Sequence, residues 1–137
     1  MADAVFLDTV GLIALLNRDD DYHGPAAAIF PEFGRSQRPV VTTNLVLAEV
    51  GNGLARTALR NEVVWLIETL YREPCATVVC VTADQMMSGV ELYRDREDKL
   101  WGLVDCVSFA LMRKMGIQDA FTADRHFEQA GFRCLLP

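Results

Sequence analysis

Residues 5–16 read VFLDTVGLIALL, and this stretch places one carboxylate, Asp8, between two apolar segments. Residues 5–7 have the pattern of a short buried strand, and residues 10–16 that of an apolar helix. A carboxylate buried without a partner is destabilising or becomes protonated. Asp8 is therefore expected where the chain leaves the sheet, at a position where an aspartate also caps a helix well.

The rest of the chain continues this alternation of strands and helices. Further strands are predicted at residues 40–42, 77–81, 117–122 and 132–135. Further helices are predicted at residues 26–33, 44 to about 59, 63–72, 83–93, 103–115 and 125–130. Such alternation predicts an α/β fold, a three-layer sandwich whose central, mainly parallel sheet has helices on both faces. Without repeats or linkers, residues 1–137 are expected to form a single domain.

The composition and net charge of the chain disfavour some classes of function. The chain has 137 residues, 51% of them hydrophobic, and a net charge of -6. No apolar run reaches the roughly 18 residues of a membrane span, and no secretory signal is evident, so we expect a cytoplasmic protein with no membrane partner. The acidic balance disfavours broad contact with nucleic acid, because phosphate contacts come from lysine and arginine. It suits a protein that keeps carboxylates for a cation.

Three aspartates occupy positions typical of a site. Ligands of open α/β sheets bind at the carboxyl ends of the strands. Asp8 and Asp124 each follow a predicted strand, so both should lie at that edge. Asp105 begins a predicted helix and shares a face with Ser108, so the two could line a polar pocket. Taken singly, each aspartate also fits a helix cap, and for Asp105 the capping alternative is a contact with the backbone of Ser108.

Glu49 is the fourth acidic candidate. The apolar face of its predicted helix consists of Leu47, Val50, Leu54 and Ala58. Glu49 points away from that face, which fits either a solvated residue or a ligand. Gly51 and Gly53 lie in the same helix, where glycine is unfavourable, and indicate close approach of another group.

The cysteines and histidines form no metal motif. Cys75, Cys80, Cys106 and Cys134 fit no zinc spacing, and we expect buried, reduced thiols. His23 and His126 are far apart in sequence and are expected to be structural or surface residues rather than ligands.

Converging carboxylates would give a definite chemistry. Hard cations such as Mg²⁺ take oxygen ligands and keep several waters. A cation held in this way polarises a phosphoryl oxygen and lowers the pKa of a bound water. A phosphodiester could then be hydrolysed without a serine, cysteine or histidine nucleophile.

Four segments, in order, resemble PIN-domain ribonucleases, and specifically the VapC-type toxins of toxin–antitoxin pairs. They are FLDTVGLIALLNRDDDYH (6–23), VVTTNLVLAEVGNGL (40–54), DKLWGLVDCVSFALMRKMGI (98–117) and DAFTADRHFEQAGF (119–132). The resemblance covers essentially the whole chain and implies a PIN-like sandwich. Gly102 departs from the pattern, because a serine is more usual there.

The resemblance also implies a metal site. Its acidic set falls on Asp8, Glu49, Asp105 and Asp124, which would be the catalytic residues and would hold one or two Mg²⁺ or Mn²⁺ ions. Asp8 and Asp105 would be the firmest ligands. Supporting hydroxyls fall on Thr9, Ser108 and Thr122. The implied reaction is endonucleolytic cleavage of RNA by an activated water.

Partners follow from the same resemblance. It implies an RNA substrate, a small antitoxin whose tail occupies the active groove, and a homodimer. Basic residues near the acidic segments are candidate RNA contacts: Arg18, Lys99, Arg113, Lys114 and Arg125. Four aromatic residues could stack on bases but are expected to pack in the core: Tyr22, Trp65, Trp101 and Phe127.

Two alternatives remain open at this point. A PIN-like binding module without catalysis would share the fold. A phospho-receiver signalling domain also holds Mg²⁺ with acids at strand ends, but it needs a lysine after a late strand. Here that strand ends AFTADR (120–125), without a lysine.

Overall fold

The computed structural model describes residues 3–137 and contains five strands and seven helices. The strands are β1 (Val5–Leu7), β2 (Val40–Thr43), β3 (Ala76–Val79), β4 (Asp119–Phe121) and β5 (Arg133–Cys134). The helices are α1 (Thr9–Leu16), α2 (His23–Arg35), α3 (Asn44–Gly53), α4 (Arg60–Arg72), α5 (Ala83–Asp95), α6 (Leu103–Met115) and α7 (His126–Gln129). All described strand pairs are parallel, and the predicted three-layer α/β sandwich is confirmed.

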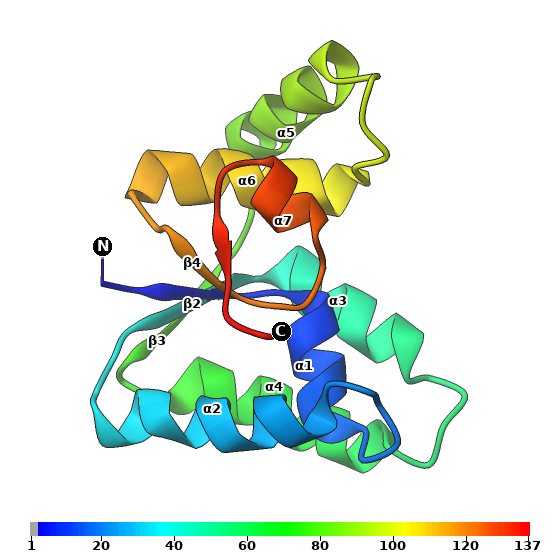
Figure 1. Cartoon of the computed structure of the whole chain (residues 1–137), viewed down its shortest axis with the longest axis vertical. Coiled ribbons are helices and arrows are strands. Elements are labelled where there is room, and N and C mark those ends of the chain that lie inside the picture. Colours follow the sequence, from blue (N-terminus) through cyan, green and yellow to red (C-terminus); the bar gives the residue numbers. More distant parts are fainter. Residues whose placement is uncertain (1–2) are drawn as a thin grey trace.

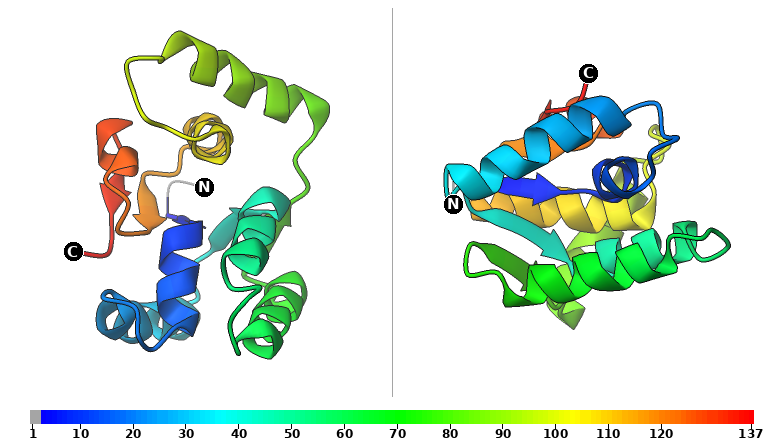
Figure 2. Two further views of the ribbon diagram at one scale, coloured as in Figure 1. Left: turned by 90° about the vertical axis from the view of Figure 1, so that its right-hand side faces the viewer. Right: turned by 90° about the horizontal axis from the view of Figure 1, so that it is seen from below.

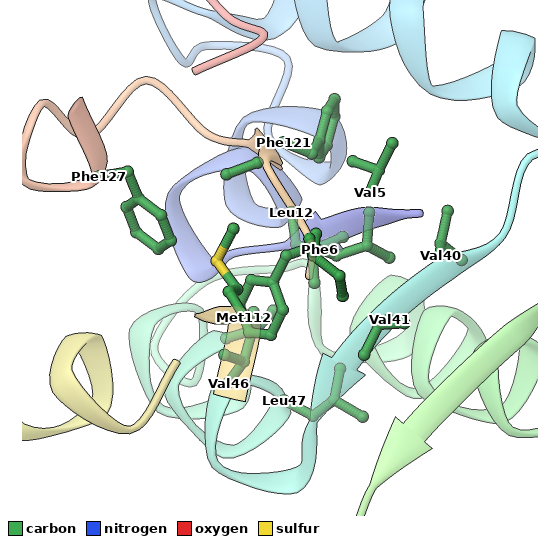
Figure 3. Close-up of a cluster of buried hydrophobic side chains, with 14 of the residues drawn as sticks. Val5, Phe6, Leu12, Val40, Val41, Val46, Leu47, Met112, Phe121 and Phe127 are labelled. Carbon is green, nitrogen blue, oxygen red and sulfur yellow. The ribbon is translucent and has the colours of Figure 1, made fainter. Parts of the chain in front are cut away.

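Helices cover both faces of the sheet. In Figure 1, α2 and α4 lie below the sheet and α6 lies above it, with α5 on the outer side of α6. Figure 2 shows the same layers from two further directions. On one face, Phe121 packs against Phe30 and Phe33, with ring centroids 5.5 and 5.8 Å apart. On the other face, Phe6 contacts Phe127 (6.4 Å). Successive strand side chains alternate between faces, so β1 and β4 contribute to the apolar cluster on both sides of the sheet, part of which Figure 3 shows.

The strand order creates a crevice at one edge of the sheet. The order is β3-β2-β1-β4-β5, so the chain first moves from β1 through β2 to β3 and then returns to the opposite side of β1. Connections after β1 and β4 therefore diverge, and ligands of open α/β sheets bind at such a switch point. Asp8 follows β1, and Thr122 follows β4.

Close packing of α1 against β4 narrows this crevice. Gly11 is buried in α1, and a Cβ atom added to it would lie 2.0 Å from the carbonyl oxygen of Phe121. No larger side chain fits without moving the helix. Glycine at this position therefore holds the start of α1, with Asp8, close to the end of β4.

The helix after β2 is shorter than predicted. α3 ends at Gly53, and a turn separates it from α4, so Ala58 is exposed rather than part of an apolar helix face. Leu54 is still buried and donates its backbone N–H to the carbonyl of Val50 (3.1 Å). The helix stops here because Gly51 and Gly53 lower its stability. A Cβ atom at Gly53 would lie 3.0 Å from Ile13, whereas Gly51 faces open space.

The cysteines are all free, but only part of the expectation for them holds. Cys106 is buried and Cys134 is half-buried, whereas Cys75 and Cys80 are exposed. The two exposed thiols flank β3, which is an edge strand of the sheet and is only partly covered. Over residues 3–137, no helix combines the length and the apolar character that crossing a membrane requires.

An ion-pair cluster around the buried carboxylate of Asp119 lies at the edge of the sheet opposite the crevice. Asp119, at the start of β4, accepts hydrogen bonds from Arg38 (2.6 Å) and from two nitrogens of Arg133 (2.9 and 2.7 Å). Burial alone would raise the pKa of Asp119, but these hydrogen bonds outweigh it and lower the pKa. At pH values above the ordinary pKa of an aspartate, the cluster therefore stabilises the folded protein. This stabilisation is lost as the pH falls through the lowered pKa of Asp119.

Replacing Asp119 by alanine is expected to lower the free energy of unfolding at pH 7 by about 2 kcal/mol, because two guanidinium groups lose a charged acceptor. Urea denaturation measures the change. Glu32→Ala is the matched control, since Glu32 pairs with Arg35 on the exposed surface of α2 and should matter by less than about 0.5 kcal/mol. Equal losses of stability in the two variants would contradict a special role for the Asp119 cluster.

Candidate functional site

Asp8 is the most buried carboxylate of the site. It precedes α1 as the N-cap and is only 3% exposed. Its Oδ2 accepts a hydrogen bond from the hydroxyl of Thr122 at 2.7 Å and a longer one from the backbone N–H of Val10 at 3.4 Å. Burial raises the pKa of Asp8 to about 7; the charges of Asp105 and Asp124 add to this, and the Thr122 hydrogen bond opposes it. Capping of α1 offsets only part of the free-energy cost of burying this carboxylate.

Thr122 joins two of the acidic segments. Its side chain is fully buried, and its Oγ1 both donates to Asp8 and accepts the backbone N–H of Asp124 at 3.0 Å. Asp124 in turn accepts the backbone N–H of His126 at 2.9 Å through Oδ1. This side-chain turn begins α7 and holds Asp124 next to Asp8.

Asp105 reaches the same place from α6. It lies in the first turn, where its Oδ2 accepts the backbone N–H of Gly102 at 3.3 Å, rather than that of Ser108. The same oxygen lies 3.2 Å from His126 Nδ1. Burial, followed by the charge of Asp124, raises the pKa of Asp105. As a glycine, Gly102 offers no side-chain cap, so the polar contact expected of a serine is missing here.

Asp8, Asp105 and Asp124 therefore converge from three segments that are far apart in sequence. One ligand atom from each of Asp105, Asp124 and His126 lies within 4.8 Å of the others. Within residues 3–137, no lysine or arginine forms a salt bridge with any of the three carboxylates. Carboxylate oxygens without a lysine or arginine partner at a partly buried site are the donor set that Mg²⁺ and Mn²⁺ take. The residues present thus fit a divalent cation.

Glu49 lies at the rim of the site. Its side chain is exposed on α3, and its Oε1 accepts a hydrogen bond from Thr9 Oγ1 at 2.6 Å. Thr9 follows Asp8 in the chain, so this bond places Glu49 beside the first acid. Glu49, like Asp8, is outside the close group formed by Asp105, Asp124 and His126. Its role as a ligand stays a prediction.

Ser108 is fully buried one turn beyond Asp105. In the part of the chain that the structure describes, its Oγ has no hydrogen-bond partner. A buried hydroxyl without a partner is unfavourable, which distinguishes Ser108 from Thr122. Its supporting role in the site stays a prediction.

His126 is the site residue that sequence reasoning missed. Its Nδ1 lies 3.2 Å from Asp105 and 3.4 Å from Asp124, although its spacing from His23 had suggested a residue outside any metal site. The available signal was its position two residues after the fourth acid, in ADRH (123–126). His23 is structural as predicted, since its Nδ1 lies 2.8 Å from the carbonyl oxygen of Ala14.

The basic candidates are more dispersed than expected. Arg113 and Lys114 lie in the last turn of α6, whereas Asp105 lies in the first, about 12 Å away along the helix. Arg125 is hydrogen-bonded to Glu128 and to a backbone carbonyl. A continuous basic track beside the acids is therefore not formed by these three residues. Arg18 and Lys99 stay candidates for RNA contact.

The aromatic candidates divide into two pairs. Trp101 and Phe127 are buried, as predicted, and Trp101 Nε1 donates to Gln129 at 3.0 Å. Trp65, on α4, is 60% exposed, and Tyr22 is 37% exposed. The prediction that Trp65 and Tyr22 pack in the core is therefore wrong.

Comparisons with known proteins agree with this geometry. Residues 5–133 match the PIN domain family. The chain is 35% identical over 129 residues to a protein named 23S rRNA-specific endonuclease VapC20 from two strains of Mycobacterium tuberculosis, covering 93% of this chain and 95% of the relative. It superposes on the crystal structure of Mycobacterium tuberculosis VapC20, described as a Sarcin-Ricin loop cleaving toxin, with a TM-score of 0.83 and 33% identity. This match covers 97% of this chain and 99% of the other.

These relatives favour neither a phospho-receiver nor a binding module without catalysis, because they are named for nuclease activity. The resemblance deduced from the four acidic segments is confirmed over nearly the whole chain. The chain belongs to the PIN domain family.

Proposed function

We propose that this protein is a metal-dependent endoribonuclease, the toxin component of a type II toxin–antitoxin pair. The observation that carries the proposal is that Asp105 and Asp124 lie together at the switch point of the sheet, close enough to the buried Asp8 for their charges to raise its pKa, without a lysine or arginine ion-pair partner within residues 3–137. Carboxylates in such a group are the ligands that a nuclease cation requires. Membership of the PIN domain family and similarity to a named endonuclease support the same reading.

The four acidic residues would have different roles according to their positions. Asp8, Asp105 and Asp124 would hold Mg²⁺ or Mn²⁺, and Glu49 would complete the site at its rim. Bound there, the cation supplies Lewis-acid polarisation of the phosphoryl group and activation of a water. Hydroxyl groups would support the acids: Thr122 orients Asp8, Thr9 orients Glu49, and Ser108 lies behind Asp105. These side chains bind and orient, and none has to act as a nucleophile.

The substrate and partners are proposed on the same basis. The substrate is RNA, and 23S rRNA is the first RNA to test, because the relatives are named for it. The partner is a small antitoxin protein. We also propose a homodimer, a cytoplasmic location alongside the RNA, and a single PIN-like domain over residues 1–137, of which residues 1 and 2 lie outside the described residues. Sedimentation of the purified protein measures the oligomeric state.

The direct test is cleavage of 23S rRNA, as intact ribosomes and as naked RNA, by the purified chain with Mg²⁺ or Mn²⁺. We expect discrete fragments that depend on the metal and disappear in a chelator. Addition of the metal after chelation should restore them. Fragments that persist in chelator would point to a contaminating nuclease. Absence of cleavage under all conditions, beside an active control nuclease, would contradict the proposal.

A further inference from the structure

We propose that His126 is a metal ligand of this site and gives it a preference for a transition-metal dication, such as Mn²⁺, over Mg²⁺. This inference rests on the proposed function, because it concerns the same metal centre. It goes further by adding a nitrogen donor to a set of carboxylates. It also gives a role to a residue that was expected to lie outside any metal site.

The spacing of the donor atoms carries the argument. His126 Nδ1 lies 3.2 Å from Asp105 Oδ2 and 3.4 Å from the Oδ1 of Asp124. Adjacent ligands of an octahedral cation with bonds of about 2.1 Å lie about 3 Å apart. Both distances are close to that value. A single proton on Nδ1 could form a good hydrogen bond with only one of the two carboxylates. A cation, by contrast, can bind the imidazole and both carboxylates at once.

The backbone fixes His126 in this position. Its N–H donates to Asp124 Oδ1 at 2.9 Å, so the imidazole and the carboxylate belong to one turn. The next residue, Phe127, is fully buried and packs edge-on against Phe109 of α6, with ring centroids 4.8 Å apart. Asp105 lies on the same helix as Phe109. The histidine is thus anchored to the helix that carries the opposing acid.

The chemistry of the donor predicts the metal preference. Mg²⁺ is a hard cation that favours oxygen and binds imidazole poorly. First-row transition metals accept imidazole nitrogen, with affinities that rise from Mn²⁺ towards Cu²⁺. An imidazole beside the carboxylates of Asp105 and Asp124 therefore favours Mn²⁺ over Mg²⁺ more than carboxylates alone would. As a ligand, the ring must be neutral with Nδ1 unprotonated, so the proton resides on Nε2.

Pulsed electron paramagnetic resonance of the Mn²⁺-loaded full chain tests the inference without relying on activity. A coordinated imidazole gives a ¹⁴N modulation, which we expect in the wild type. The chain has two histidines, so two variants assign the signal. His126→Gln should abolish the modulation, and the matched control His23→Gln should retain it, because His23 contacts the carbonyl of Ala14 instead.

Calorimetric titration gives an independent readout. In His126→Gln, the Kd for Mn²⁺ should rise about tenfold, while the Kd for Mg²⁺ should change by less than about threefold. His126→Asp is the second variant, in case the first does not fold. It should lack the ¹⁴N modulation yet still bind both metals through oxygen, with a lower preference for Mn²⁺.

Three results would overturn the inference: Mn²⁺ bound to the wild type without ¹⁴N modulation, a modulation that persists in His126→Gln, or equal losses of Mn²⁺ and Mg²⁺ affinity. The same experiments test the proposed function separately from the role of His126. Metal-dependent RNA cleavage by a wild type without the nitrogen signal would remove only the role of His126. Failure of the wild type to bind Mn²⁺ or Mg²⁺ would remove both.

Discussion

RNA cleavage by Asp8→Asn or Asp105→Asn is expected to be at least about 1,000-fold slower than by the wild type at the same Mg²⁺ or Mn²⁺ concentration. An amide has nearly the shape of a carboxylate but lacks the charge that holds a cation. Both aspartates face the same site, so either change should leave the charge of the reacting phosphate uncompensated. Initial rates on 23S rRNA, measured over a range of metal concentrations, give the comparison.

Asp95→Asn is the control for this comparison. Asp95 is exposed at the end of α5, where it pairs with Arg94, and its replacement removes the same charge from the protein. Its rate should stay within about twofold of the wild type, because exposed ion pairs contribute little. Wild-type rates in both Asp8→Asn and Asp105→Asn would show that the activity does not come from this site.

Asp8 should also make the metal-free protein less stable as the pH rises. The pKa of Asp8 is about 7 in the folded protein and 3.8 as an ordinary value. Between these values the unfolded chain loses the proton while the folded chain retains it, so ionisation favours unfolding. The free energy of unfolding in chelator should fall by on the order of 4 kcal/mol between about pH 4 and pH 8, relative to Asp8→Asn.

Urea denaturation at several pH values, with chelator and with Mg²⁺ or Mn²⁺, measures this effect. Above pH 7, Asp8→Asn should be more stable than the metal-free wild type. Adding metal should restore the stability of the wild type and have little effect on the variant. The Asp119 cluster acts at the opposite end of the pH range, below about pH 4, so the two effects separate. An Asp8→Asn protein that unfolds far more easily than the wild type in chelator would show Asp8 to be structural.

Local physics accounts for the parts of the fold that were predicted well. The strand 5–7 and the helix 103–115 were predicted with the bounds that the structure has. Short apolar runs and a closing glycine, Gly116 in left-handed conformation, mark them in the sequence alone. The helix after β2 was predicted too long, because the apolar spacing of Leu54 and Ala58 masked the effect of Gly51 and Gly53.

The sequence by itself determined the helices and strands of this protein, because these depend on residues close in sequence and on apolar periodicity. It also determined the fold class, which follows from the alternation of strands and helices, and the order of the acidic segments. Tertiary structure alone decided which acids meet. Return of the chain to the far side of β1 places Asp124 beside Asp8, and the start of α6 brings Asp105 to both. It also places His126 between two carboxylates and leaves Glu49 at the rim. Contacts between residues 21 to 114 positions apart arise from sheet order and close packing, which no local pattern encodes.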